Sequence, residues 1–493
     1  MRALVALAVL LLAPVASAEF GRYDATGYPL AVDGTPTYPG GILPTGQLPE
    51  GPLNRVGPFT VYPYYPILTA EVQRLAAEHP DLVKLHSAGK STLGLDLWML
   101  EIADFANPDM LPLEKREVVW VDGGTHSNEY SGVWFAAHLA SFLAGGYGAN
   151  ETATWIVENR HTWIMPLVNP DGSHAFGRLN AHGVNVNRNY PVDWGALAED
   201  ALFNNPGPHP ASEVETQHNI AWFNKTRPDL YVSIHCCGNL WLYPYGVEGL
   251  DPLDQQMLSR VCDEAFPSVR DDCGPIWSTI YPASGSSVDT VYEYTGAAAF
   301  GYEMSGRGAV ALWGQPFTAN AIEAEEVESW TGILHGFLNV HRYGAYPELV
   351  GARVEGDEVV LRVRNEGYGN LTNTTVSTAF QPAGPAGMLV DPAILTVPLP
   401  ALLPGEETEV RARIDGAGML TLRVDYVKRH MASPTGERTF ELEVREEAGG
   451  LVVFFGGEAL AATSAGGAAV PFVAPAAVAV VLAGLALRRP RRE

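Results

Sequence analysis

A histidine and a glutamate three positions apart, His126 and Glu129, follow a short apolar run at residues 118–121. Imidazole nitrogen and carboxylate oxygen are both zinc ligands, and a catalytic zinc usually has three protein ligands and one open position. His235 ends a second apolar run at residues 230–234 and could complete such a set. Each residue alone is ordinary, since His-x-x-Glu is often a surface pair and a lone histidine is more often part of a core. Together, at two strand ends, they indicate a metal site.

Two further charged groups stand out from their surroundings. Arg178 lies near the start of the polar segment 177–190. An arginine in such a segment can bind a carboxylate with a bidentate ion pair. The alternative is an ion pair at the surface or between domains. Glu303 lies inside the apolar run 299–304. Because an unpaired buried carboxylate is costly, Glu303 is either paired or functional.

The elements that must position these residues are apolar strands with helices between them. The strand candidates are residues 118–121, 162–168, 230–234 and 299–304, and residues 68–79 have an amphipathic helical pattern. Apolar strands that stop at polar loops, with helices between, are typical of a mixed, largely parallel, twisted α/β sheet flanked by helices. In open α/β sheets, sites form at the carboxyl ends of strands, where most of these residues lie.

From about residue 58 to 340, the chain resembles the zinc metallocarboxypeptidases of the carboxypeptidase A type. The resemblance rests on short pieces that occur in the family's order. They are His126 to Glu129, Asn169-Pro170-Asp171-Gly172, Gly177-Arg178-Leu179-Asn180, Asn187-Arg188-Asn189, Pro210-Ala211-Ser212-Glu213, Ser233-Ile234-His235, Tyr243-Pro244-Tyr245-Gly246, Ile280-Tyr281-Pro282-Ala283-Ser284-Gly285 and Tyr302-Glu303. Each piece is weak by itself, but the ordered set is specific.

The resemblance implies a carboxypeptidase-like fold, one Zn²⁺ ion per chain and hydrolysis of the C-terminal peptide bond of peptides. His126, Glu129 and His235 are implied as the zinc ligands. Glu303 is implied as the general base that activates the zinc-bound water. Arg178 is implied to stabilise the oxyanion together with the metal.

The same resemblance implies how a substrate would be selected. Asn187 and Arg188 would bind its terminal carboxylate, and Tyr281 would close over it. This places only the final peptide bond at the metal, which makes an exopeptidase. The implied side-chain pocket is uncharged, and this predicts a preference for neutral, apolar or aromatic C-terminal residues. Its positions are Ile276, Ala283, Val288 and Gly301.

Four positions depart from the family pattern. Asn185 stands where most members have an aspartate that accepts a hydrogen bond from the first zinc histidine, and the loss of that charge is expected to change metal affinity by about tenfold to a hundredfold. Asn128 replaces an arginine found in some members. Cys236 and Cys237 follow the third ligand, where pancreatic-type members have serine and tyrosine.

The chain has four cysteines, and their spacing leaves the pairing open. A disulfide between Cys262 and Cys273 would close a short loop and is the first choice. Cys236 and Cys237 are adjacent, so a bond between them would be strained. Four buried thiols are the alternative.

The rest of the chain changes character at both ends. Residues 1–18 have the pattern of a signal peptide, and residues 19–57 that of a linker or strap before the domain at 58–345. Residues 346–446 alternate in the manner of a small all-β sandwich. Residues 447–467 are expected to be a Gly- and Ala-rich linker.

The C-terminal end predicts a membrane anchor. Residues 468–487 are uncharged and mostly apolar, long enough for a transmembrane helix, and the basic tail 488–493 follows at once. A removable sorting tail is the alternative. Either reading places the folded part of the chain on the extracellular face of the cell membrane.

Composition narrows the classes of partner. The 493 residues suggest two or three domains. A net charge of −25 disfavours nucleic acid, because phosphate binding needs a basic surface. Two alternatives to a carboxypeptidase are a related hydrolase acting on an acyl amino acid or a cell-wall peptide, and a cell-surface binding protein with an inactive peptidase-like domain. Against the second, every expected catalytic position is filled.

Overall fold

The computed structural model describes residues 64–107, 110–174, 177–197, 204–236, 238–265, 273–304, 330, 332–383, 395–430 and 432–459. The expected signal peptide (1–18), N-terminal linker (19–57), transmembrane segment (468–487) and basic tail (488–493) lie outside these residues. Within the described part, we find no helix that is long and apolar enough to cross a membrane.

The chain divides into two compact units. The first contains residues up to Tyr343 together with Arg429–Pro434, and the second contains Gly344–Lys428 and the residues from Thr435 onward. The expected boundary at 345 lies two residues from this division. Each unit has its own sheets and its own core.

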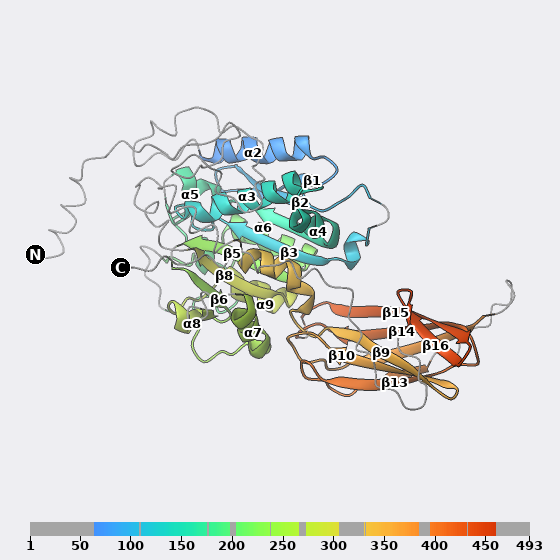
Figure 1. The fold of residues 1–493 in the computed structure, drawn as a ribbon. Helices are drawn as coiled ribbons and strands as arrows, with labels where there is room; N and C mark the ends of the chain where they lie inside the picture. Colours follow the sequence, from blue (N-terminus) through green and yellow to red (C-terminus); the bar gives the residue numbers. More distant parts are fainter. Residues whose placement is uncertain are drawn as a thin grey trace, which may run out of the picture. The chain divides into compact units, whose positions relative to one another are not determined.

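The first unit is built on one eight-stranded mixed sheet (Figure 1). The strand order is β1-β2-β4-β3-β5-β8-β6-β7. The central strands β4, β3, β5 and β8 are parallel to one another, as are β6 and β7, while the other neighbours are antiparallel. The strands are β1 (Val83–Lys90), β2 (Asp96–Ile102), β3 (Glu117–Gly123), β4 (Arg160–Met165), β5 (Leu230–Cys236), β6 (Leu240–Tyr243), β7 (Cys273–Pro275) and β8 (Ala298–Met304). The expected α/β class with a mixed sheet is confirmed.

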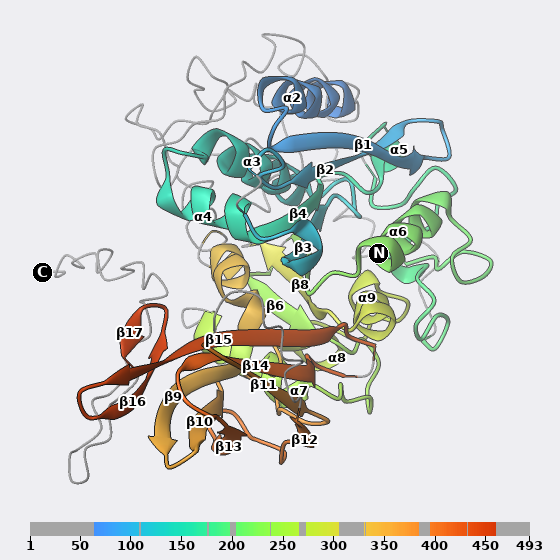
Figure 2. The same cartoon turned by 90° about the vertical axis from the view of Figure 1, so that its right-hand side faces the viewer.

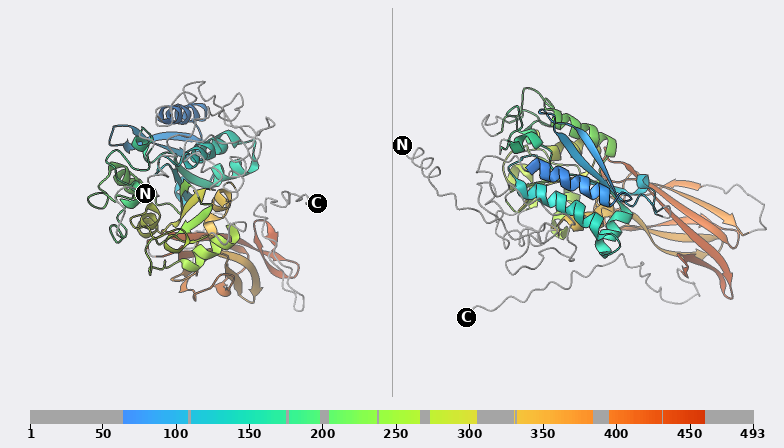
Figure 3. Two further views of the ribbon diagram at one scale, coloured as in Figure 1. Left: turned by 90° about the vertical axis from the view of Figure 1, so that its left-hand side faces the viewer. Right: turned by 90° about the horizontal axis from the view of Figure 1, so that it is seen from above.

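Helices cover both faces of this sheet. In Figure 2, α3 and α4 lie on one side of the strands, and α6 and α9 on the other. In the right-hand view of Figure 3, the blue helix α2 runs alongside the teal helix α3. The helices are α2 (Tyr64–Glu78), α3 (Tyr130–Gly146), α4 (Glu151–Asn159), α5 (Pro170–His174), α6 (Val214–Thr226), α7 (Gln255–Ala265), α8 (Ile276–Thr279) and α9 (Ser287–Thr295); residues 332–339 are also helical, and short 3-10 turns occur at Leu113–Lys115, Val186–Arg188 and Val340–Arg342.

The four predicted apolar strands correspond to β3, β4, β5 and β8, and the amphipathic pattern to α2. Every residue of β5 is buried, which fits a strand covered on both faces. The predicted disulfide is confirmed: Cys262 at α7 is bonded to Cys273 at β7. Cys236 is disulfide-bonded as well, so the alternative of four free thiols is wrong.

The second unit consists of two antiparallel sheets, of orders β13-β10-β9 and β12-β11-β14-β15-β16-β17. Alternate side chains of both sheets form one apolar core that includes Leu361, Val410, Leu422 and Phe440. The strands are β9 (Pro347–Glu355), β10 (Glu358–Asn365), β11 (Thr375–Pro382), β12 (Leu395–Pro398), β13 (Glu407–Arg413), β14 (Gly418–Val427), β15 (Thr435–Glu447), β16 (Gly450–Phe455) and β17 (Glu458–Ala459).

One expectation for this unit is corrected. The predicted linker at 447–467 is not a linker in its described part, because residues up to 459 include β16, which pairs with β15, and β17, which pairs with β16. The apolar run 451–455 lies between two glycine pairs. The glycines suggested a flexible segment, whereas the side chains between them complete the core, with Val453 fully buried.

Candidate metal centre and substrate site

Close backbone packing brings His126 and Glu129 next to His235. β3 ends at Gly123, and Glu129 is the residue that precedes the first turn of α3. A Cβ atom added at Gly132, in that first turn, would lie 2.7 Å from the carbonyl oxygen of Ile234 on β5. Glycine therefore allows α3 to begin against the end of β5, and the loop after β3 reaches the third predicted ligand.

The three predicted ligands form a compact, buried triad. His126 Nδ1 lies 2.9 Å from Glu129 Oε1, His235 Nδ1 lies 2.9 Å from Glu129 Oε2, and the two Nδ1 atoms are 3.2 Å apart. Their side chains are no more than 5% exposed. Ligand atoms bound to a tetrahedral zinc at about 2.1 Å lie about 3.3 Å from one another. The donor set and its spacing therefore fit one metal ion.

The outer nitrogens of the two imidazoles face hydrogen-bond acceptors. His126 Nε2 lies 3.0 Å from Asn185 Oδ1, and the Asn185 amide nitrogen donates to Asn204 at 3.3 Å, which fixes the amide orientation. His235 Nε2 lies 3.2 Å from Ser233 Oγ. A proton on each Nε2 leaves a lone pair on each Nδ1, directed into the triad, as metal binding requires. The departure at Asn185 thus preserves the hydrogen bond but not the charge.

The pKa shifts of His126 and Glu129 favour the forms that bind a cation, whereas that of His235 favours its protonated form, whose proton a cation must displace. Burial, followed by the charge of Arg178, lowers the pKa of His126 to about 3. Burial alone would raise the pKa of Glu129, but the two histidines hold it well below its ordinary value. Burial lowers the pKa of His235, and the hydrogen bond to Glu129 outweighs this and raises it. A neutral imidazole and an ionised carboxylate are the forms that bind metal.

Glu303 is placed beside the triad by strand register. β8 runs parallel to β5 with Glu303 paired to His235, so the two side chains leave adjacent strands at the same level. Burial, and then the negative charge of Glu129, raise the pKa of Glu303 to about 7. A cation at the triad acts in the opposite direction and lowers it. Without a bound cation, Glu303 therefore titrates near neutral pH, in the range of a general base.

Arg178 points into the same centre. Its Nη1 atom lies 3.0 Å from His126 Nδ1 and 3.0 Å from Glu129 Oε1, and its side chain is 23% exposed. The guanidinium thus brings a positive charge into contact with the triad and remains accessible from outside. It is placed where an oxyanion formed next to the metal could be stabilised.

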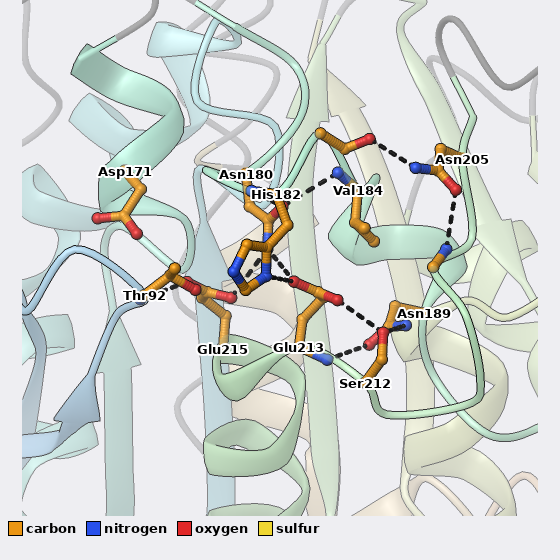
Figure 4. A network of polar contacts seen from close by, with 12 residues as sticks. Thr92, Asp171, Asn180, His182, Val184, Asn189, Asn205, Ser212, Glu213 and Glu215 are labelled. Carbon is orange, nitrogen blue, oxygen red and sulfur yellow. Dashed lines mark hydrogen bonds and ion pairs between the residues drawn. The ribbon is translucent and has the colours of Figure 1, made fainter.

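The loop that carries Arg178, Asn187 and Arg188 is held by a polar network at its base (Figure 4). The Asn180 side chain accepts the backbone N–H groups of His182 and Val184, both at 3.0 Å, which closes the turn. Its amide nitrogen donates to two buried carboxylates at the start of α6, those of Glu213 at 2.7 Å and Glu215 at 3.1 Å. Further bonds join Asn189 to Ser212 and Glu213, and Asn205 to Gly183 and Asn185.

The predicted carboxylate-binding residues lie on this loop and on the segment before α9. Asn187 Oδ1 accepts the backbone N–H of Ser287 at 3.0 Å, which turns its amide nitrogen toward His235, 3.4 Å away. The guanidinium of Arg188 lies 5.9 Å from the centre of the Tyr281 ring, and Tyr281 is 44% exposed. The structure thus places Arg188 and Tyr281 together, with Asn187 next to the triad.

Glycine holds the two segments together. Gly285 has φ +70°, and a Cβ atom there would lie 2.3 Å from the carbonyl oxygen of Arg188. The carbonyl of Gly285 in turn accepts the backbone N–H of Tyr190 at 3.1 Å. Only glycine fits this close approach without strain.

The predicted pocket residues Ile276, Ala283 and Val288 are buried, and a Cβ atom at Gly301 would contact Val288 at 3.6 Å. Sequence analysis missed an acid directly behind this pocket. Asp289 is fully buried and accepts the backbone N–H of Gly246 at 3.0 Å. Burial raises its pKa to about 7.

Sequence analysis also missed two polar residues behind His235. Ser233 Oγ donates to Asp122 Oδ1 at 2.8 Å, and both residues are fully buried. Burial raises the pKa of Asp122 to about 6, so the carboxylate is its main form above neutral pH. The available signals were an aspartate directly after the apolar run 118–121 and a serine two positions before the histidine, on the same face of β5.

A family model described as zinc carboxypeptidase matches residues 68–332. The chain belongs to the zinc carboxypeptidase family. Carboxypeptidase A1 of Sus scrofa is 28% identical over 291 residues, covering 53% of this chain and 65% of the relative. Carboxypeptidase A1 of Homo sapiens is 30% identical over 295 residues with the same coverage. The chain thus spans slightly less than two thirds of the length of these curated relatives.

A solved structure of thrombin activatable fibrinolysis inhibitor has the same fold. It is 20% identical, has a TM-score of 0.50 and covers 57% of this chain and 74% of its own. The residues matched by the family model lie in the first unit.

Proposed function

We propose that this chain is a zinc-dependent carboxypeptidase that hydrolyses the C-terminal peptide bond of peptides. The observation that carries the proposal is the convergence at one centre of the triad, Glu303 from the neighbouring strand and Arg178 from the loop. Three ligands, a base and a cation are the parts that metal-assisted amide hydrolysis requires.

In this mechanism, a Zn²⁺ ion supplies Lewis-acid chemistry, polarising a carbonyl and making a water molecule more acidic. Glu303 accepts a proton from the attacking water and passes it to the leaving amine, for which its pKa is suited. Arg178, already directed at the centre, stabilises the negative charge that develops on the carbonyl oxygen.

The substrate is held by its terminal carboxylate. Arg188 supplies a permanent positive charge, and Asn187 supplies an amide N–H donor close to the triad. Tyr281 is exposed enough to move over a bound peptide. A free carboxylate one residue away from the reacting bond is therefore required.

The pocket supports a preference for neutral, apolar or aromatic C-terminal residues. Its three buried side chains carry no charge. A Cβ atom at Gly246 would lie 1.7 Å from the carbonyl oxygen of Ala283, so an acidic side chain cannot be accommodated there. A panel of peptides that differ only at the last residue tests this point. Faster release of Lys or Arg than of Leu or Phe would contradict it.

We also propose that the protein is exported and anchored at the cell surface. The N-terminal signal-peptide pattern, the apolar segment 468–487 and the basic tail support this. The Cys262–Cys273 disulfide fits an oxidising compartment. When cells that express the full chain are fractionated, we expect the protein in the membrane pellet. A chain that ends at residue 465 should be recovered in the soluble fraction. Recovery of both in the soluble fraction would contradict anchoring.

The proposed activity is tested with a matched pair of peptides, one with a free C-terminus and one with the same sequence amidated. The free peptide should lose its last residue, the amidated peptide should react at least a hundredfold more slowly, and a zinc chelator should abolish the reaction. Equal rates on both peptides, or activity that resists the chelator, would overturn the proposal.

A further inference from the structure

A buried chain of hydrogen bonds runs from the metal centre to a carboxylate behind it. It begins at His235 Nε2, which lies 3.2 Å from Ser233 Oγ. Ser233 Oγ lies 2.8 Å from Asp122 Oδ1, and the hydroxyl of Tyr231 lies 2.8 Å from Asp122 Oδ2. Asp122, Ser233 and Tyr231 are completely buried. We refer to Asp122 and Ser233 as the relay.

Strand geometry produces this arrangement. β3 and β5 are parallel neighbours with Asp122 paired to Ser233 in register. Tyr231, Ser233 and His235 are two residues apart along β5, so their side chains share one face of the sheet. The carboxylate on β3 therefore receives two hydroxyl groups from β5, while the third residue of that face faces the metal centre.

The direction of the hydrogen bonds fixes the tautomer of His235. A carboxylate only accepts, so the hydroxyls of Ser233 and Tyr231 both donate to Asp122. The oxygen of Ser233 is then left to accept a proton from His235 Nε2. The amide nitrogen of Asn187, 3.4 Å from His235 Nε2, can only donate and favours a proton on Nδ1, but it lies farther from Nε2 than the oxygen of Ser233 at 3.2 Å. His235 thus keeps its Nδ1 lone pair for the metal.

The two metal-binding histidines differ in what lies behind them. Behind His126 is the neutral amide of Asn185, at 3.0 Å. Behind His235 is a hydroxyl backed by a carboxylate. Among the hydrogen bonds given above for the described residues of these two chains, the negative charge is that of Asp122.

We propose that Asp122, acting through Ser233, is a positioning residue for zinc: it holds His235 in the tautomer that binds metal and supplies the negative charge that Asn185 lacks. The proposal rests on the metal-binding role assigned to the triad. Its chemistry concerns the affinity for zinc and not the hydrolytic step, so it can be measured without a peptide.

Two variants break the relay in different ways. Ser233→Ala removes the acceptor for His235 Nε2. Asp122→Asn keeps the shape, but its amide can donate to Ser233, which can then donate to His235 Nε2 and favour a proton on Nδ1, where the metal must bind. Tyr231→Phe is the matched control, because it removes the other hydroxyl from Asp122 without touching the path to His235.

The experiment measures the zinc dissociation constant of the full chain by competition with a chelator, alongside thermal unfolding of the metal-free protein. We expect Ser233→Ala and Asp122→Asn each to weaken zinc binding by about tenfold to a hundredfold, and Tyr231→Phe by less than about threefold. The double variant should lose little more than the single variants, because both act on one path. Ser233→Thr, which keeps the hydroxyl, should restore most of the affinity.

Unchanged affinity in both relay variants, or an equal loss in Tyr231→Phe, would overturn the relay. A loss that simply follows the unfolding temperature across all variants would overturn it as well. The zinc-binding experiment tests the relay independently of the proposed peptidase activity. Zinc binding that depends on the relay in a protein without peptidase activity would refute only the activity, and full activity with relay-independent zinc binding would refute only the relay.

Discussion

At the scale of single residues, the chemistry depends on which atom of each imidazole carries the proton. His126 and His235 both direct Nδ1 into the triad because an acceptor lies behind each Nε2. The three ligands could be proposed from sequence only through the ordered family motifs, since His-x-x-Glu and a single histidine are common. Asp122 and Ser233 could not, because a polar side chain within an apolar strand gives no indication of which neighbour it faces.

The amide at Asn185 gives a prediction at this scale. Asn185→Asp restores a carboxylate 3.0 Å from His126 Nε2 and should tighten zinc binding by about tenfold. Asn185→Ala removes the acceptor and should weaken it by a similar factor. Chelator competition at one pH measures both variants. Weaker binding by Asn185→Asp than by the unmodified protein would show that the bond to Asn204 matters more than the charge.

At the scale of elements, long apolar runs were predictable and short or half-exposed strands were not. β3, β4, β5 and β8 are apolar runs covered by helices on both faces, and their sequences show this directly. β1 alternates buried and exposed residues irregularly, and β7 has only three residues. These strands are ordered by pairing with their neighbours, which is tertiary information that a local pattern does not contain.

A residue in helix α9 makes a pH-dependent contribution to the stability of the first unit. Asp289 lies in the first turn of the helix, where its backbone N–H donates to Ser286 Oγ, and its buried carboxyl has a pKa of about 7 against an ordinary value of 3.8. A carboxyl whose pKa is raised on folding contributes stability below the unfolded pKa, and this contribution is lost as the pH rises through the folded pKa. The stability of the first unit therefore falls as the pH rises from about 4 to about 7, and this contribution does not change further above pH 7.

Asp289→Asn removes this titration. Relative to the unmodified protein, the variant should gain stability between pH 6 and pH 8, by about 2 to 4 °C in the midpoint of thermal unfolding. Each pH unit between the unfolded and the folded pKa corresponds to about 1.4 kcal/mol, and about one such unit lies between pH 6 and pH 7. Thermal unfolding at the two pH values measures the difference. A difference in unfolding midpoint between the two proteins that does not change with pH would contradict the titration assigned to Asp289.

At the scale of the whole molecule, the metal site belongs to one of two compact units. Sequence placed the change of character near residue 345 because the strand–helix alternation gives way to short alternating strands. The end of the second unit was not predicted correctly, because the glycines around residues 451–455 are typical of a linker and not of a strand. Nor did the sequence indicate that Arg429–Pro434 belongs to the first unit, since that grouping exists only in three dimensions.

Zinc should therefore stabilise one unit selectively. A ligand that binds only the folded state adds about 2.7 kcal/mol at a hundred times its dissociation constant. Calorimetry of the full chain should show the transition of the first unit moving upward with zinc, while that of the second unit stays in place. A shift of both transitions by the same amount would contradict a metal site confined to the first unit.

The most direct test of the central claim is the rate of peptide hydrolysis by Glu303→Gln, with the zinc content measured on the same sample. Glutamine keeps the size of the side chain but cannot accept a proton, so kcat/KM should fall by a factor of about 10² to 10⁴ while one zinc ion per chain remains bound. Near-normal hydrolysis by the zinc-loaded variant would contradict Glu303 as the base. If the variant loses zinc as well as activity, this would contradict the claim that Glu303 is not itself a zinc ligand.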